Sequence, residues 1–137
     1  GRGGDSCAVS AGAVGHATRP WGCAPEAEGA GVGRAEEGGR GRGMEVGVGR
    51  LLGAGGGRAA AAGDRDGFVK LLFDGEERLI GAHMVGAGVT EMLAEPTLAK
   101  ALGVTAHRLA RVIHAHPTMS EGVMEAAEAA MGAAIHL

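Results

Sequence analysis

The sequence predicts an α+β domain in which helices pack on a small antiparallel sheet, preceded by a disordered glycine-rich segment. Two observations predict this fold class. Residues 67–85 are rich in strand formers and alternate apolar with polar side chains, whereas residues 90–131 space their apolar side chains at helical intervals. Strands followed by helices, without strand–helix alternation, favour an antiparallel sheet.

The first part of the chain differs from the rest in composition. Of the 28 glycines, 20 lie in residues 1–66, and residues 29–43 are mostly Gly, Arg, Ala and Glu with no apolar period. Such a stretch buries too little apolar surface to offset the entropy lost on ordering it. We therefore predict that residues 1–43 are low-complexity and disordered, and that the folded domain spans 44–137, with its clearest signals in 67–137.

Three strands are expected in the folded part. Residues 44–49 alternate like a short strand, although their glycines weaken it. Residues 68–73 are rich in β-branched, aromatic and other apolar side chains, as strands are. The pair Asp74-Gly75 is a tight-turn signal that joins this strand to the next one, residues 79–85, and the two should form a hairpin.

Three helical segments follow the hairpin. The first, residues 90–102, should end before Gly103 and be kinked or split by Pro96, which lacks a backbone N–H. The second covers residues 105–114, with Thr105 as its N-cap, and the third covers residues 119–131. The expected buried side chains are Leu109, Val112 and Ile113 on the second helix and Val123, Ala127, Ala130 and Met131 on the third.

Composition excludes several classes of function. The net charge is −3 and aromatic residues make up 2% of the chain, so a nucleic-acid surface is not expected. No apolar run approaches eighteen residues, so no membrane span is expected. Cys7 and Cys23 have neither the spacing of a redox pair nor that of a zinc site, even with His16 between them, and are interpreted as ordinary thiols.

The predicted folded part is small for an independent domain. It has about seventy residues, two of them phenylalanines, and no disulfide or metal site to reinforce its core. Association with another surface would supply the missing burial. The sequence therefore predicts an interaction domain.

One segment concentrates residues that can carry chemistry, His114-Ala115-His116-Pro117-Thr118-Met119-Ser120-Glu121. Pro117 keeps His116 out of the helical conformation, so His116 should lie in a loop just before the third helix. Glu121, in the first turn of that helix, could orient the imidazole and stabilise its protonated form, as in general acid–base catalysis. The pattern from Thr118 to Glu121 is equally that of a capping box, a purely structural role. Both interpretations stay open on spacing alone.

The other histidines form no clear site. His114 and His116 could be taken for a metal pair, but on an extended loop their side chains would point in opposite directions. His83 lies on a strand face with Leu79 and Val85 and is interpreted as a packed histidine. The remaining three, His16, His107 and His136, belong to no constellation.

Taken as a string, residues 114–121 resemble the signature of dihydrolipoamide (dihydrolipoyl) dehydrogenases, members of the pyridine nucleotide-disulfide oxidoreductase family. The flanking segments 67–70, 79–86, 91–95 and 132–137 resemble the strands, helix and tail of the C-terminal dimerisation domain of these enzymes, in the same order. The resemblance covers residues 67–137 well and extends weakly back to Met44.

The resemblance implies specific roles for two residues. His116 would be the acid–base residue that deprotonates a dihydrolipoamide thiol, and Glu121 would be its hydrogen-bonded partner. The His116–Pro117 peptide bond would be cis. The chain would form a homodimer in which this histidine faces the redox disulfide and the flavin of the other subunit, and the substrate would be the lipoamide of a 2-oxo acid dehydrogenase complex.

The resemblance also implies FAD and NAD in the complete enzyme, but no cofactor is expected to bind this chain alone. A flavin site needs a Gly-x-Gly-x-x-Gly turn, and the nearest match, Gly55-x-Gly57-x-x-Ala60, lies in a Gly- and Ala-rich run that produces such matches by chance. Redox cysteines four residues apart are lacking too. The chain is therefore expected to be an incomplete, inactive fragment, whose family occurs in the bacterial cytoplasm, the mitochondrial matrix and plastids.

Two alternatives remain. The first is the dimerisation domain of a related flavin disulfide reductase such as glutathione reductase, although Ala115 and the run Glu125-Ala126-Ala127 favour the lipoamide enzyme. The second is a stand-alone dimerisation module with no catalytic role.

Overall fold

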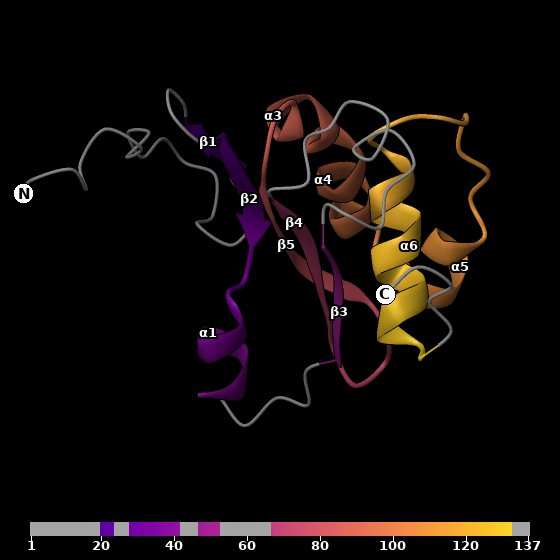
Figure 1. Cartoon of the computed structure of the whole chain (residues 1–137). Helices are drawn as coiled ribbons and strands as arrows, with labels where there is room; N and C mark the ends of the chain where they lie inside the picture. The colour runs from indigo at the N-terminus through magenta and orange to yellow at the C-terminus, as the bar shows by residue number, and fades with distance from the viewer. Residues whose placement is uncertain (1–19, 24–27, 42–46, 53–66, 133–137) are drawn as a thin grey trace, which may run out of the picture.

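A computed structural model of the chain describes residues 20–23, 28–41, 47–52 and 67–132, which form one sheet with helices against it (Figure 1). The strands are β1 (Trp21–Cys23), β2 (Gly29–Gly33), β3 (Gly47–Leu52), β4 (Phe68–Phe73) and β5 (Leu79–Val85). Their order in the sheet is β1-β2-β5-β4-β3, and every neighbouring pair is antiparallel. The α+β fold class is thereby confirmed.

The predicted hairpin forms the centre of the sheet. Phe68 of β4 pairs with Val85 of β5, and the register continues to a slip between Leu72 and Phe73. The Oδ1 atom of Asp74 accepts hydrogen bonds from the backbone N–H groups of Glu76 and Arg78, each at 2.9 Å. Asp74 thus closes the turn with its side chain, as aspartate often does in tight connections.

The sheet reaches further toward the N-terminus than the composition predicted. Strands β1 and β2 and helix α1 (Glu36–Arg40) lie within the segment predicted to be disordered, and β2 pairs with β5. Ala30 and Val32 of β2 are buried. The structure differs from the prediction here because glycine serves close packing: a Cβ on Gly31 would lie 2.8 Å from the Trp21 ring. The predicted division at residues 43 and 44 therefore does not coincide with an edge of the sheet.

The outer strand β3 overlaps the predicted strand over 44–49 only in part. It begins at Gly47, continues to Leu52 and pairs with β4 along its whole length. Residues 44–46 of the prediction lie outside the described residues.

The split of the first predicted helix is confirmed. It forms α3 (Val89–Met92) and α4 (Ala94–Ala101). Pro96 is the third residue of α4, where a backbone N–H would have no acceptor within the helix, so the proline costs no hydrogen bond. Helix α4 ends at Ala101, and the chain leaves the helix through Leu102 and the predicted Gly103, whose φ of 64° is left-handed. The N–H groups of Gly103 and Val104 donate to the carbonyls of Lys100 and Ala99, a common helix-terminating motif.

The second predicted helix is shorter than expected. Helix α5 (Ala106–Ala110) begins after Thr105, whose hydroxyl accepts from Arg108 N as an N-cap should, and it does not continue to residue 114. Val112 and Ile113 were predicted to be buried, and this prediction was wrong because both are exposed. The last turn of α5 is tightened: the N–H groups of Arg111 and Val112 donate to the carbonyls of Arg108 and Leu109, three residues back, and the helix does not continue beyond them.

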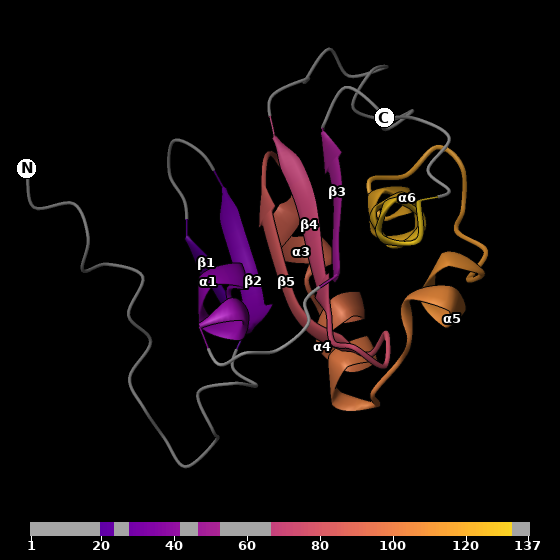
Figure 2. The ribbon, with the colours of Figure 1, turned by 90° about the horizontal axis from the view of Figure 1, so that it is seen from below.

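The third predicted helix is α6 (Glu121–Ala130). Together with α4 and α5 it lies on one side of the sheet (Figure 2). Val123 and Ala127 are buried as predicted, and Ala130 packs against the core, but Met131 is exposed because the helix ends at Ala130. The core lies between α6 and the sheet and includes Leu71, Phe73, Ala82, Met84, Val123, Ala126 and Ala127. No helix in the described ranges is long and apolar enough to cross a membrane.

Candidate functional site

The two predicted site residues, His116 and Glu121, lie in and directly after the loop between α5 and α6. Residues 111–117 are described throughout, and all but His114 are exposed. The peptide bond between His116 and Pro117 is cis, as the resemblance implied. The loop leads directly into the first turn of α6, where Glu121 is the first helical residue.

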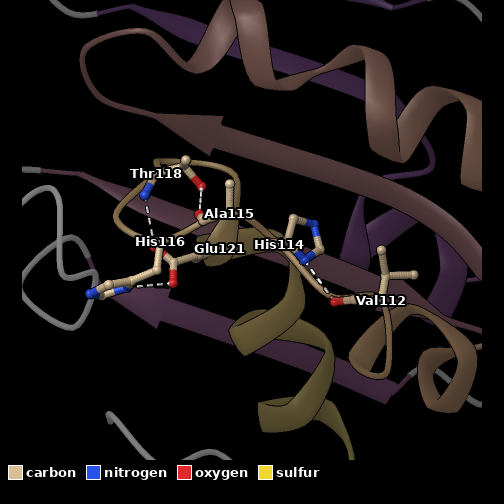
Figure 3. Close-up of polar contacts among 6 residues, drawn as sticks. All are labelled: Val112, His114, Ala115, His116, Thr118 and Glu121. Atoms are coloured by element: carbon tan, nitrogen blue, oxygen red, sulfur yellow. Dashed lines mark hydrogen bonds and ion pairs between the residues drawn. The ribbon is translucent and has the colours of Figure 1, made fainter.

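The structure brings His116 and Glu121 together. Nδ1 of His116 lies 2.8 Å from Oε1 of Glu121 (Figure 3). Because a carboxylate only accepts, Nδ1–H is the donor, and in the neutral ring Nε2 is left as the basic nitrogen. The His116 side chain is 74% exposed, whereas that of Glu121 is only 12% exposed. The pair is therefore an exposed base held by a nearly buried carboxylate.

The second oxygen of Glu121 serves the backbone. Oε2 accepts from Thr118 N at 2.8 Å, which is the carboxylate half of a capping box. The other half is not formed, because the Thr118 hydroxyl donates to the carbonyl of Ala115 at 2.7 Å and the N-cap of α6 is Ser120. Glu121 can therefore serve both predicted roles at once: Oε2 caps the backbone, and Oε1 holds the His116 ring.

These hydrogen bonds set the charge state of Glu121. The backbone N–H of Thr118, followed by the His116 ring, lowers the pKa of the carboxyl below its ordinary value, because both donors favour the ionised form. The carboxylate therefore stays negative in neutral solution. A fixed negative charge beside an imidazole stabilises the ring once it has gained a proton.

His114 belongs to a second pair that spacing did not reveal. Its Nε2 lies 2.7 Å from Oε1 of Glu95, and its side chain is only 7% exposed. Glu95 is on α4, nineteen residues earlier, and only the packing of α4 against the loop brings the two together. No signal in the sequence distinguished Glu95 from other helix-opening glutamates.

The remaining histidines are placed away from this loop. The rings of His114 and His116 point to opposite sides (Figure 3), and no group of three metal-ligating side chains occurs in the described part of the chain. His83 is half-buried, with its Nε2 2.9 Å from the carbonyl oxygen of Arg34, and packs near the Trp21 ring. The exposed His107 ring lies 3.2 Å from the Arg111 guanidinium. Cys7, His16 and His136 lie outside the described residues.

Comparison with protein families gives a direct assignment. The family model of the pyridine nucleotide-disulphide oxidoreductase dimerisation domain matches residues 20–127. The chain belongs to this family. The match begins at the first described strand, so the family domain includes β1 and β2 as well as residues 67–127 of the segment that the resemblance had identified.

Curated relatives of this domain include dihydrolipoyl dehydrogenases. The chain is 48% identical over 75 residues to the dihydrolipoyl dehydrogenase of Bacillus subtilis, a match that covers 54% of this chain and 16% of that protein. It is 49% identical over 74 residues to the dihydrolipoamide dehydrogenase of Chaetomium thermophilum, covering 53% of this chain and 15% of that protein. The chain thus spans about a sixth of the length of these relatives.

Solved structures share the fold. LpdA from Mycobacterium tuberculosis has a TM-score of 0.78 at 22% identity, over 84% of this chain and 25% of that protein. A Cu(II) complex of the HOCl-induced flavoprotein disulfide reductase RclA from Escherichia coli has a TM-score of 0.77 at 26% identity, over 81% of this chain and 25% of that protein. The sheet and helices described above are therefore a fold that occurs within larger disulfide reductases.

The residues described do not fit a dinucleotide cofactor. A flavin or nicotinamide pyrophosphate sits at a glycine turn between a strand and a helix of a parallel βαβ unit. All strand pairs of the described sheet are antiparallel, so no such unit occurs among them. The glycine match at residues 55–60 lies outside the described residues.

Proposed function

We propose that the chain is the dimerisation domain of a dihydrolipoyl dehydrogenase and supplies His116 and Glu121, as an acid–base pair, to the active site of the partner subunit. The observation that carries this proposal is the exposed His116 ring, whose Nδ1 is bound to Glu121 and whose Nε2 has no hydrogen bond to any described residue. The identity of 46–49% to dihydrolipoyl dehydrogenases supports the choice of enzyme.

The geometry is suited to removing a proton from a thiol. A dihydrolipoamide S–H would give its proton to Nε2 of His116, leaving a thiolate, which is the nucleophile in disulfide exchange. The ring would then be an imidazolium, and its Nδ1–H would remain bound to the Glu121 carboxylate. FAD and NAD would supply the electron transfer from other parts of the complete enzyme.

A homodimer would explain why the His116 ring is exposed. Closed active sites exclude water, yet the His116 side chain is 74% exposed. Ile113, three residues earlier, is 96% exposed, so apolar surface faces water beside this histidine. Contact with a second subunit would cover Ile113 and enclose His116 in the same step.

A related disulfide reductase is the second candidate. The structural similarity to RclA, a flavoprotein disulfide reductase, favours it, because the same fold occurs in that enzyme. The two candidates share the role of His116 and differ in the substrate whose sulfur is deprotonated. A stand-alone module without catalysis is the third, and it predicts that His116 is dispensable.

The test joins this full chain to the flavin and nicotinamide domains of the Bacillus subtilis relative, in place of that protein's own dimerisation domain. We expect the fusion to form NADH from NAD and dihydrolipoamide. The variant His116→Gln should lower kcat roughly 10²- to 10⁴-fold, as loss of a general base does, with unchanged flavin content. The matched control is His107→Gln on α5, which should retain full activity.

Each alternative has a distinct result. Oxidation of NADH or NADPH by glutathione disulfide, with no NADH formed from NAD and dihydrolipoamide, would support the related reductase. Equal activity of the fusion and its His116→Gln variant would contradict the acid–base role. An inactive but dimeric fusion would favour the non-catalytic module.

A further inference from the structure

The loop that carries His116 has an anchor of its own, formed by His114 and Glu95. Nε2 of His114 lies 2.7 Å from Oε1 of Glu95, and Nδ1 lies 2.9 Å from the carbonyl oxygen of Val112. Both ring nitrogens are therefore engaged, one by a helix and one by the loop itself. The function proposed above gives this pair no role.

Burial shows that His114 is the point where the loop meets the body of the domain. Within residues 111–117, all of which are described, His114 alone is not exposed. Its side chain is 7% exposed, whereas that of the preceding Ile113 lies almost entirely in solvent. Before His116, the loop is thus held to α4 by the His114 side chain.

The partners of His114 restrict the orientation of its ring. The Val112 carbonyl lies at one ring nitrogen and the Glu95 carboxylate at the other, and the Glu95 side chain is only 29% exposed. Two contacts on one planar ring fix its rotation more closely than either contact alone. Hydrogen bonds to a carboxylate are also shorter and stronger than neutral ones.

We infer that His114 and Glu95 are positioning residues that fasten the loop to α4 and so set the place of His116. The downstream side of His116 is fixed by α6, through Glu121 and its bond to Thr118 N. The upstream side is fixed by His114, two residues before. Together the two histidine–glutamate pairs hold the loop at both ends. The catalytic part of this inference rests on the proposed function of His116.

The first experiment uses the full chain labelled with ¹⁵N and measures backbone and imidazole NMR signals. Glu95→Ala removes the acceptor, and Glu95→Gln keeps an oxygen at the same place without its charge. The matched control is Glu91→Ala, because Glu91 opens α3 as Glu95 opens α4 but is exposed and has no part in the loop. Amide signals of β4 and β5 report whether each variant is folded.

We expect Glu95→Ala to raise the fast mobility of amides 112–116 and to shift the His116 ring signals, with β4 and β5 unchanged. Glu95→Gln should show a smaller change of the same kind, and Glu91→Ala none. Loop and His116 signals that stay as in the parent chain, in a folded Glu95→Ala variant, would overturn the inference. If Glu95→Ala does not fold, the same signals from amides 112–116 and the His116 ring are measured in Glu95→Gln, and unchanged signals there would overturn the inference.

The second experiment introduces the same substitutions into the fusion enzyme. Because His116 acts in the chemical step, its misplacement should lower kcat roughly tenfold to a hundredfold with little change in KM. Unchanged kcat in Glu95→Ala, despite a mobile loop, would also overturn the positioning role. A fusion without any turnover would instead count against the proposed function, and the NMR signals would still decide whether the pair holds the loop.

Discussion

Similar side chains are buried in one region of the molecule and exposed in another. The two regions are the contact between α6 and the sheet, and the loop that precedes α6. Leu71 of β4 lies under α6 and is 0% exposed, whereas Ile113 of the loop is 96% exposed, although both are aliphatic and of like size. In the loop it is the polar His114 that is shielded from solvent. The usual relation of polarity to burial is therefore reversed over a few residues.

This reversal separates the part of the chain that maintains the fold from the part that we propose meets a second subunit. Burial of Leu71 removes apolar surface from water within the domain. Exposure of Ile113 leaves apolar surface in water until something covers it. The histidine–glutamate contacts then hold a loop whose apolar residues Val112 and Ile113 are exposed.

The largest expected effect tests the buried side of the comparison. Leu71→Ala should lower the free energy of unfolding by about 2–5 kcal/mol, because it removes buried methyl groups and leaves a cavity between β4 and α6. Ile113→Ala, the matched exposed change, should stay within roughly 0.5 kcal/mol. Denaturant unfolding of the two variants and the parent chain measures both values. Equal losses would show that the loop is packed in the isolated chain.

An effect of intermediate size is expected on self-association, and it tests the role of the exposed Ile113. Ile113→Lys should weaken self-association of the chain by roughly tenfold or more, because it places a hydrated charge where the proposed interface needs apolar contact. Sedimentation over a range of concentrations measures the change. The control is Glu91→Lys on α3, a surface change of charge away from the loop, which should leave association as it is. Equal association of the Ile113→Lys variant and the parent would place the interface elsewhere.

The smallest expected effect concerns acid stability at the start of α6. The pKa of Glu121 is lowered in the folded chain by Thr118 N and the His116 ring, so its ionised form stabilises the fold above the ordinary glutamate pKa. That contribution should be lost as the pH falls from roughly 5 through the lower folded pKa.

The variant Glu121→Gln isolates this contribution. It should be less stable than the parent chain near neutral pH and should depend less steeply on pH below about 5. Thermal midpoints measured from neutral to acidic pH provide the comparison, with Glu91→Gln as the control for loss of one carboxylate. Parallel curves for Glu121→Gln and the parent would contradict the assigned cause of the pKa shift.

Several elements followed from local chemistry and were predictable. The hairpin rests on a period of two and on Asp74, and the end of α4 rests on Gly103, whose left-handed φ glycine adopts without strain. His116 and Glu121 are five residues apart, with only a short loop between them, a separation that the sequence already limits. Each of these features depends on neighbours along the chain.

Other features could not be predicted from composition or apolar spacing. The composition of residues 1–43 predicted disorder because it offers little apolar surface to bury, yet Gly31 lies in β2 where a Cβ would meet the Trp21 ring. The apolar period through Ile113 predicted a longer helix, but α5 ends at Ala110 in a tightened turn whose N–H groups donate three residues back. Neither outcome is visible in the period of the apolar side chains.

The sequence by itself determined the class of fold, the family resemblance and the pairing of His116 with Glu121, because these depend on periodicity, turn residues and short separations. Only the tertiary structure decided that β2 joins the sheet beside β5 and that Glu95 on α4 reaches His114. The physical reason is distance along the chain: a hydrogen bond between residues nineteen or more positions apart is set by how whole elements pack, and no local preference encodes that packing.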